Sequence, residues 1–190
     1  MKSKIVLQNA LPVNLAHEIR EAFLNTDYDK ITQERKGFYS REFQNPSKEI
    51  PGHDEVYTAE FYRSRYLETS TLIIDTYEDN IKPIVEKQLN VLLETYDLRV
   101  YKMMEGGHFR IHKDDYLAKY GFIWYLSRDW KWDWGGLLLD IDSDGKAEAT
   151  LPQFNQLVIM DHSDGLIPHC VTEVAKHAKE PRLMLVGFLT

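Results

Sequence analysis

The segment FRIHKDDY, residues 109–116, places two groups that can bind a metal ion two residues apart. Apolar and polar residues alternate up to His112, as in a half-buried β-strand, and the alternation then ends in a cluster of charge. Successive side chains of a strand point to opposite faces, so the imidazole of His112 and the carboxylate of Asp114 are expected on one face. This pair predicts part of a metal site.

A third ligand is expected from a distant part of the chain. Two histidines and one carboxylate form the facial triad that binds non-haem Fe(II) and leaves coordination positions open. His169 opens the apolar segment HCVTEV, and closure of a β-barrel brings distant strands together. We therefore predict His112, Asp114 and His169 as catalytic metal ligands. The simpler alternative is a strand-end His112 hydrogen-bonded to Asp114, because a single His-x-Asp is a weak signal.

A second His-x-Asp occurs at His162 and Asp164, within the segment DHSDGLIP. This segment is rich in residues that favour turns. The only later histidine at longer range, His177, lies in the charged segment AKHAKEP. We therefore interpret His162 and Asp164 as part of a loop and not as metal ligands.

Arg182 begins the last apolar segment, RLMLVGFL. A buried guanidinium is costly unless it is paired, and its planar donor groups suit a carboxylate. The last segment itself contains no acidic residue. A small dicarboxylate cosubstrate that also chelates the metal would supply the partner, whereas the alternative is an exposed arginine at a turn. The connection EVAKHAKEP predicts a hairpin that places the last strand beside the His169 strand.

The elements that must position these residues change character near Leu98. The first half is expected to be helical, with one helix from Pro12 to near Asn25 and a second from about Glu68 to Leu93 that Pro83 kinks or divides. The segment between them, Lys36–Tyr66, contains prolines and a glycine and is interpreted as mostly loop.

From Leu98 onward the sequence contains eight short apolar runs of strand length, with no helical pattern between them. The runs are LRVYKMM, HFRIH, FIWYLS, GGLLLDI, AEATLP, NQLVIMD, HCVTEV and RLMLVGFL. This order favours an antiparallel sandwich or barrel over a parallel sheet. We predict a mainly β, jelly-roll-like core with N-terminal helices packed outside it.

Composition is that of an ordinary globular domain: 190 residues, 43% hydrophobic and 28% charged. No apolar run is long enough to span a membrane. The single cysteine, Cys170, excludes an intrachain disulfide and fits a reducing, cytoplasmic compartment. The net charge of −7 argues against a nucleic-acid partner bound through a general basic surface.

Residues from about Leu98 to Thr190 resemble the Fe(II)- and 2-oxoglutarate-dependent oxygenases, in particular the prolyl 4-hydroxylase-like branch with the hypoxia-inducible-factor prolyl hydroxylases. The matching segments are YKMMEGGHFRIHKD, WYLSRDWKWDWGGLLLDI, LPQFNQLVIMD, PHCVTEV and RLMLVGFL. In the family a Tyr, His-x-Asp, Tyr-Leu-x-x-x-Trp, Gly-Gly-x-Leu, His-x-Val and Arg follow one another in this order. The family fold is a double-stranded β-helix, in agreement with the strand pattern.

The resemblance implies roles for individual residues. His112, Asp114 and His169 would bind iron, and Arg182 would bind the distal carboxylate of 2-oxoglutarate. Tyr125 would donate a hydrogen bond to that carboxylate, and Tyr101 would line the cosubstrate or substrate side of the site. The implied cofactors are Fe(II), 2-oxoglutarate as cosubstrate and O2, and the resemblance admits ascorbate as well.

The implied reaction is hydroxylation of an unactivated C–H bond, with succinate and CO2 as co-products. Related halogenases carry a small residue where this chain has Asp114, so the carboxylate favours hydroxylation. The substrate that the branch implies is a prolyl or other residue of a protein or peptide. Phe188 stands where prolyl hydroxylases often carry Trp, which leaves the substrate open. A free amino acid or biosynthetic intermediate is the alternative, and a non-enzymatic metal-binding protein of cupin type is a further one.

The whole chain, residues 1–190, is expected to form one oxygenase domain. Residues 1–95 would supply helical support and a substrate loop, and residues 96–190 the catalytic β core. Lys36–Tyr66 is rich in aromatic residues and arginine, and we expect it to select the prime substrate. Trp130, Trp132 and Trp134 alternate with charged residues and are expected to share a face, either at the substrate entrance or in packing against the helices.

Overall fold

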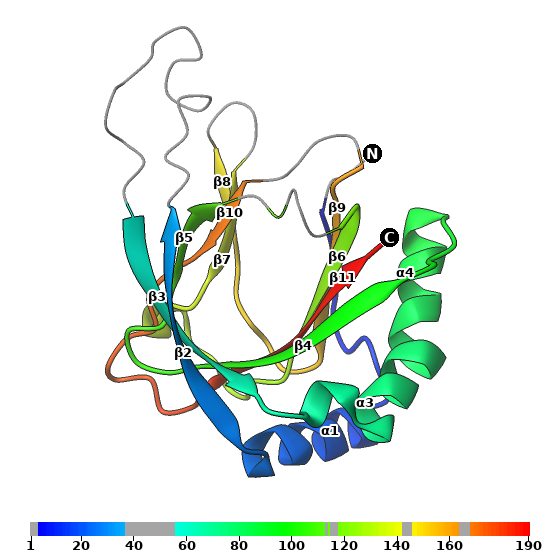
Figure 1. The fold of residues 1–190 in the computed structure, drawn as a ribbon, viewed down its shortest axis with the longest axis horizontal. Coiled ribbons are helices and arrows are strands. Elements are labelled where there is room, and N and C mark those ends of the chain that lie inside the picture. The colour runs from blue at the N-terminus through cyan, green and yellow to red at the C-terminus, as the bar shows by residue number, and fades with distance from the viewer. Residues whose placement is uncertain (1–3, 37–55, 113, 115–117, 142–145, 164–167) are drawn as a thin grey trace, which may run out of the picture.

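The structure is a computed structural model that describes residues 4–36, 56–112, 114, 118–141, 146–163 and 168–190. Two antiparallel sheets face each other, and the helices pack outside the larger sheet (Figure 1). The larger sheet has seven strands in the order β1-β9-β6-β11-β4-β3-β2, and the smaller has four in the order β5-β10-β7-β8. This is the mainly β, double-stranded β-helix arrangement that the sequence predicts.

The strands of the larger sheet are β1 (Lys4–Leu7), β2 (Tyr28–Lys36), β3 (Val56–Ser64), β4 (Tyr96–Met103), β6 (Tyr120–Tyr125), β9 (Gln156–Asp161) and β11 (Arg182–Leu189). Those of the smaller sheet are β5 (Phe109–His112), β7 (Leu138–Ile141), β8 (Ala147–Thr150) and β10 (His169–Val171). Each of the eight strands predicted after Leu98 is present.

The helices are α1 (Val13–Asn25), α3 (Thr71–Thr76) and α4 (Lys82–Leu89). Short helical turns occur at η1 (Leu67–Thr69), at η2 (Tyr77–Ile81), which is a π-helix, and at η3 (Trp132–Trp134). None of the helices in the described part of the chain has the length and apolarity needed to span a bilayer.

The first half of the chain is less helical than predicted, because β1, β2 and β3 belong to the larger sheet. The interpretation of Lys36–Tyr66 as mostly loop is wrong for Val56–Ser64, which forms β3, while residues 37–55 lie outside the described residues. Ala59 and Phe61 are buried, whereas Glu60 between them is exposed. The alternation is difficult to recognise in the sequence because most of the neighbouring residues are polar. Pairing with β4 stabilises β3.

The second predicted helix is interrupted before Pro83 and not at it. The π-helical turn Tyr77–Ile81 separates α3 from α4, and Pro83 lies in the first turn of α4, where its missing N–H costs no hydrogen bond. The helix also ends at Leu89, earlier than predicted, because Asn90 adopts a left-handed conformation (φ 56°) that terminates it.

Two apolar clusters hold the layers together. One lies between the helices and the outer face of the larger sheet and includes Phe23, Tyr77 and Trp124. The other lies between the two sheets and includes Met103, Tyr125 and Met184. Strand residues therefore alternate between a helix-facing core and the interior of the barrel, and the interior is where the site lies.

Asn155 ties α1 to the barrel. Its side chain accepts hydrogen bonds from the Leu11 N–H (3.1 Å) and the Trp124 indole (3.1 Å), and it donates one to the Leu11 carbonyl (2.7 Å). Asn155 is 1% exposed, so its loss would leave these groups buried without partners.

We expect Asn155→Ala to lower the free energy of unfolding by roughly 2–4 kcal/mol, since three buried hydrogen bonds are lost together. Urea unfolding followed by circular dichroism would measure this. Asn155 also has a positive φ (59°), and so does the exposed Asn9 (φ 49°). Asn9→Ala is therefore the control for backbone conformation alone, and equal losses in both variants would contradict the role assigned to the hydrogen bonds.

Candidate metal and cosubstrate site

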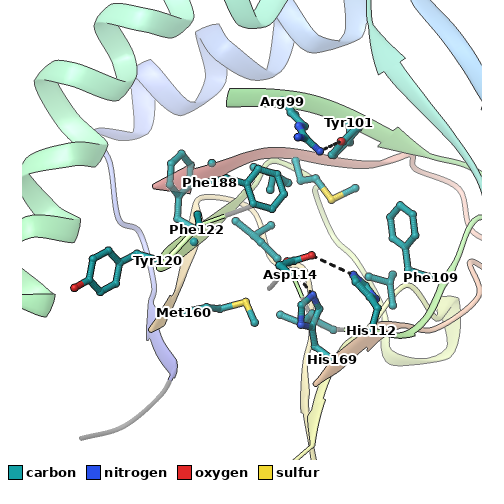
Figure 2. Close-up of a pocket in the computed structure, with 18 of the residues that line it drawn as sticks. Arg99, Tyr101, Phe109, His112, Asp114, Tyr120, Phe122, Met160, His169 and Phe188 are labelled. Atoms are coloured by element: carbon teal, nitrogen blue, oxygen red, sulfur yellow. Dashed lines mark hydrogen bonds and ion pairs between the residues drawn. The ribbon is translucent and has the colours of Figure 1, made fainter. Parts of the chain in front are cut away.

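The side chains of His112, Asp114 and His169 meet in the interior of the barrel. Their ligand atoms all lie within 4.8 Å of one another. The Asp114 carboxylate lies 3.7 Å from His112 Nε2 and 3.4 Å from His169 Nε2 (Figure 2). His112 and His169 are register partners in the β5–β10 pair, and their rings lie 4.3 Å apart between centroids. The structure thus brings together the three residues that the sequence singles out.

A hydrogen bond to the backbone fixes the orientation of the His112 ring. His112 Nδ1 lies 2.7 Å from the carbonyl oxygen of Arg110, to which it donates, so Nε2 is the nitrogen that faces Asp114. A hydrogen bond of this kind sets the tautomer and leaves the other nitrogen as a ligand.

The carboxyl group of Asp114 is held in its ionised form. Burial by itself raises the pKa of Asp114, but the hydrogen bond and charge of His169 and the charges of His112 and His162 outweigh it and lower the pKa to about 2. One anionic oxygen ligand therefore stands between two imidazoles, which is the donor set of a facial triad.

His162 lies in a loop, as the sequence predicts, but this loop reaches the site. His162 follows the end of β9, is 8% exposed and lines the same pocket as His169 and Asp114. Its ring centroid lies 6.5 Å from that of His169, and it is not a member of the three-residue ligand cluster. The inward alternation of Val158 and Met160 continues to His162, although the residues that follow favour turns. Asp164 lies outside the described residues.

Arg182 is fully buried at the inner end of the pocket. Nε donates to the Gly136 carbonyl (2.7 Å), Nη2 donates to the Tyr125 hydroxyl (3.0 Å), and Nη1 faces the sulfur atoms of Met103 and Met184. Thioether sulfur is a weak acceptor. Among the described residues no carboxylate forms an ion pair with Arg182, and its burial lowers the pKa of the guanidinium.

The predicted position of the last strand is wrong. β11, which carries Arg182, lies between β6 and β4 in the larger sheet, whereas β10, which carries His169, lies between β5 and β7 in the smaller sheet. The connection between them crosses from one sheet to the other and is pinned by a bridge between Gly135 and Val174. Arg182 therefore faces the ligand cluster across the barrel.

Tyr125 and Tyr101 both lie on the interior side, in different surroundings. Tyr125 is fully buried beside Arg182, and burial raises the pKa of its phenol, which stays protonated as a donor. Tyr101 lines the pocket, but its hydroxyl contacts Arg99 and its ring packs edge-on against Phe61. In the described part of the chain, no hydrogen bond joins Tyr101 to Arg182.

The three tryptophans do not share a face. Trp130 and Trp134 are buried and pack edge to face at 5.3 Å, whereas Trp132 is 61% exposed. Burial alternates with exposure among these tryptophans because Trp132–Trp134 form a 3-10 turn and not a strand. Trp130 lies over Gly136, where an added Cβ would be 3.1 Å from its ring and 3.0 Å from Arg182. Trp130 therefore packs beside the Arg182 end of the pocket, whereas Trp132 does not.

Comparison with known proteins identifies the class. The sequence profile of the 2OG-Fe(II) oxygenase superfamily matches residues 97–190, which include His112, Asp114, His169 and Arg182. The chain belongs to this superfamily and is a 2-oxoglutarate-dependent dioxygenase that uses Fe(II), 2-oxoglutarate and O2. No sequence among the curated proteins matches the chain significantly.

Solved structures with a similar fold include prolyl hydroxylases and an epimerase. A prolyl hydroxylase from Trichoplax adhaerens, in complex with a peptide fragment of hypoxia inducible factor, has a TM-score of 0.69 at 17% identity, with 100% of this chain and 84% of that chain covered. A Pseudomonas putida prolyl-4-hydroxylase has a TM-score of 0.61 at 18% identity, with 98% and 91% covered. The epimerase SnoN from nogalamycin biosynthesis has a TM-score of 0.63 at 11% identity, with 97% and 77% covered. At these identities the likeness concerns the fold.

Proposed function

We propose that this dioxygenase hydroxylates an unactivated C–H bond, with Fe(II) held by His112, Asp114 and His169 and with 2-oxoglutarate held by Arg182 and Tyr125. The observation that carries the proposal is Arg182, a fully buried guanidinium without a carboxylate partner among the described residues, in the same pocket as the ligand cluster. A buried charge of this kind is expensive unless an anion binds to it.

The donor set fits the metal and the pocket fits the cosubstrate. Two imidazole nitrogens and one ionised carboxylate occupy one face and leave positions open toward the pocket. At the other end, Nη1 of Arg182 faces only thioethers among the described residues, so it can donate to a carboxylate together with the Tyr125 hydroxyl. A dicarboxylate keto acid that chelates the metal with one end would meet both requirements.

The side chains of the protein bind the metal and the cosubstrate, orient them and exclude water. Bound Fe(II), with 2-oxoglutarate and O2, supplies the oxidising chemistry, and succinate and CO2 are the expected co-products. Asp114 and the two histidines fix the metal on one wall, and Arg182 with Tyr125 fixes the far end of the cosubstrate. Apolar side chains such as Met184 and Ile123 line the space between them and keep water from the reacting atoms.

For the prime substrate we propose a residue of a protein or peptide, prolyl or another. Support comes from the Trichoplax hydroxylase, which is described with a bound peptide. A small-molecule substrate is the second candidate, supported by the likeness to SnoN, an enzyme of a biosynthetic pathway. We also propose that residues 1–190 act as one oxygenase domain, with residues 96–190 as its catalytic core.

Incubation of a cell lysate with the enzyme, Fe(II) and 2-oxoglutarate is expected to yield at least one protein or metabolite heavier by one oxygen atom. Mass spectrometry of both fractions, with 18O2 to label the inserted atom, measures this. Parallel incubations lack 2-oxoglutarate or contain Asp114→Ala. A labelled product that persists in either control would contradict the assigned chemistry, and a product without the label would contradict hydroxylation by O2.

A further inference from the structure

A second arginine, Arg99, lines the pocket but belongs to neither the ligand cluster nor the cosubstrate end. Arg99, Tyr101 and Met103 occupy alternate positions on the interior face of β4. In the β4–β11 pair, Arg99 is opposite Val186, whereas Met103 is opposite Arg182. Four residues of strand span about 13 Å, so the two arginines lie at different depths of the barrel.

A cosubstrate anchored on Arg182 would be too short to span the separation of the two arginines along the strands. A five-carbon dicarboxylate spans roughly 6 Å when its C–C bonds are about 1.5 Å long. The guanidinium of Arg99 lies over the ring of Phe188, 4.5 Å from its centroid, and Phe188 is farther along β11 from Arg182 than Val186 is. Arg99 is therefore left for the other reactant, the prime substrate.

Neighbouring side chains fix the Arg99 guanidinium before any ligand binds. Nε and Nη2 donate to Oδ2 of Asp97 at 3.0 and 2.6 Å, and the Phe188 ring supports one face. Nη1 lies 3.4 Å from the Tyr101 hydroxyl, a distance at which a hydrogen bond is weak. Nη1 and the Tyr101 hydroxyl are thus two neighbouring donors with capacity for a further acceptor.

The surroundings indicate what kind of molecule these donors would orient. Figure 2 shows Arg99 and Tyr101 on the β4 wall, across the pocket from His112 and His169. Most of the residues that line the pocket between the two walls are apolar, and they include Ile123, Met160, Met184 and Val186. A molecule that spans this distance would carry an anionic group at one end and an apolar body next to the metal ligands.

We propose that Arg99 and Tyr101 bind a carboxylate of the prime substrate and thereby place an apolar C–H bond of that substrate at the iron site. This inference rests on the proposed function, because it assigns Arg182 to the cosubstrate. The carboxylate belongs to a free amino acid or other small acid, or to an acidic side chain or the C-terminus of a peptide. Both sources present the same planar group to the guanidinium, which suits it geometrically.

The test compares matched pairs of probes that differ only in this group. Proline, leucine, isoleucine and phenylalanine are paired with their carboxamides, and hexapeptides containing glutamate are paired with the same peptides containing glutamine. Each probe is titrated anaerobically by calorimetry into the full chain loaded with Mn(II) and 2-oxoglutarate. The variants are Arg99→Gln, Arg99→Lys and Tyr101→Phe. The control Arg128→Gln also removes a guanidinium that lies over a ring, that of Phe154, outside the residues that line this pocket.

At least one carboxylate probe is expected to bind about tenfold or more tightly than its amide, since a charge-assisted pair is lost in the amide. Arg99→Gln is expected to reduce this ratio to about one, Tyr101→Phe to reduce it in part, and Arg128→Gln to leave it unchanged. Preference among free amino acids or among peptides identifies the source. Wild-type protein that binds no carboxylate better than its amide, or a preference that survives in Arg99→Gln, overturns the inference.

Turnover of 2-oxoglutarate by the Fe(II)-loaded wild type is measured separately. Normal turnover without a carboxylate preference refutes this inference alone. Absence of Fe(II)-dependent turnover, with the carboxylate preference intact, refutes the proposed function and leaves the Arg99 site standing.

Discussion

Asp114→Ala and His169→Ala are each expected to abolish succinate formation and to lower the affinity for Fe(II) by about 100-fold or more. Loss of a partner outside the ligand set costs about 10- to 100-fold in other metal sites, and loss of a direct ligand costs at least as much. His169 Nε2 and the Asp114 carboxylate lie 3.4 Å apart. Equilibrium dialysis with Fe(II) under argon and succinate release measured by mass spectrometry give the two quantities.

His162→Ala is the discriminating comparison. His162 and His169 are similarly buried, at 8% and 5% exposure, and both line the pocket, but only His169 belongs to the ligand cluster. His162→Ala is therefore expected to keep Fe(II) affinity within a few-fold of the wild type. Comparable iron affinity and turnover in His169→Ala, or loss of both in His162→Ala, would show that the wrong histidine has been assigned. Circular dichroism of each variant excludes unfolding as the cause.

The fold of the second half of the chain was predictable from sequence because its strands are short apolar runs separated by turn residues. β2 and β3 were not, since their residues are largely polar and their extended conformation depends on pairing with each other and with β4. Pairing between distant segments is a tertiary effect that local patterns do not encode. The position of β11 was not predictable for the same reason. The connection after β10 is long enough either to form a hairpin or to cross to the other sheet, and local sequence does not decide between the two.

The site was predictable where the two-residue period of a strand is clear. This period places His112 and Asp114 on one face, and it would also have found Arg99, which alternates with Tyr101 and Met103 in β4. It failed where a strand ends: His162 keeps the inward direction of β9 for one residue beyond the strand. It also failed at Trp130–Trp134, since residues two apart do not share a face in a 3-10 turn.

Arg182→Ala is expected to raise the concentration of 2-oxoglutarate needed for half-maximal turnover by about 30-fold to several thousand-fold. The range corresponds to roughly 2–5 kcal/mol for removing one partner of a desolvated charge pair. Arg182 is fully buried and donates to the Tyr125 hydroxyl, so its removal also takes away the hydrogen bond that holds Tyr125 in the proposed cosubstrate site. Fe(II) affinity without cosubstrate is expected to change little, because Arg182 is not in the ligand cluster.

Arg182→Lys and Arg182→Met separate this role from packing. Lysine keeps the charge but cannot donate to the Gly136 carbonyl and a carboxylate in one plane, so an intermediate loss is expected. Methionine keeps most of the volume next to Met103 and Met184 without the charge, and is expected to match alanine in cosubstrate affinity while it unfolds at a higher temperature. The apparent affinity for 2-oxoglutarate from succinate release and calorimetric binding to the Mn(II)-loaded protein measure the effect. An affinity unchanged in Arg182→Met would remove the cosubstrate role and leave the buried guanidinium as a structural feature of the barrel.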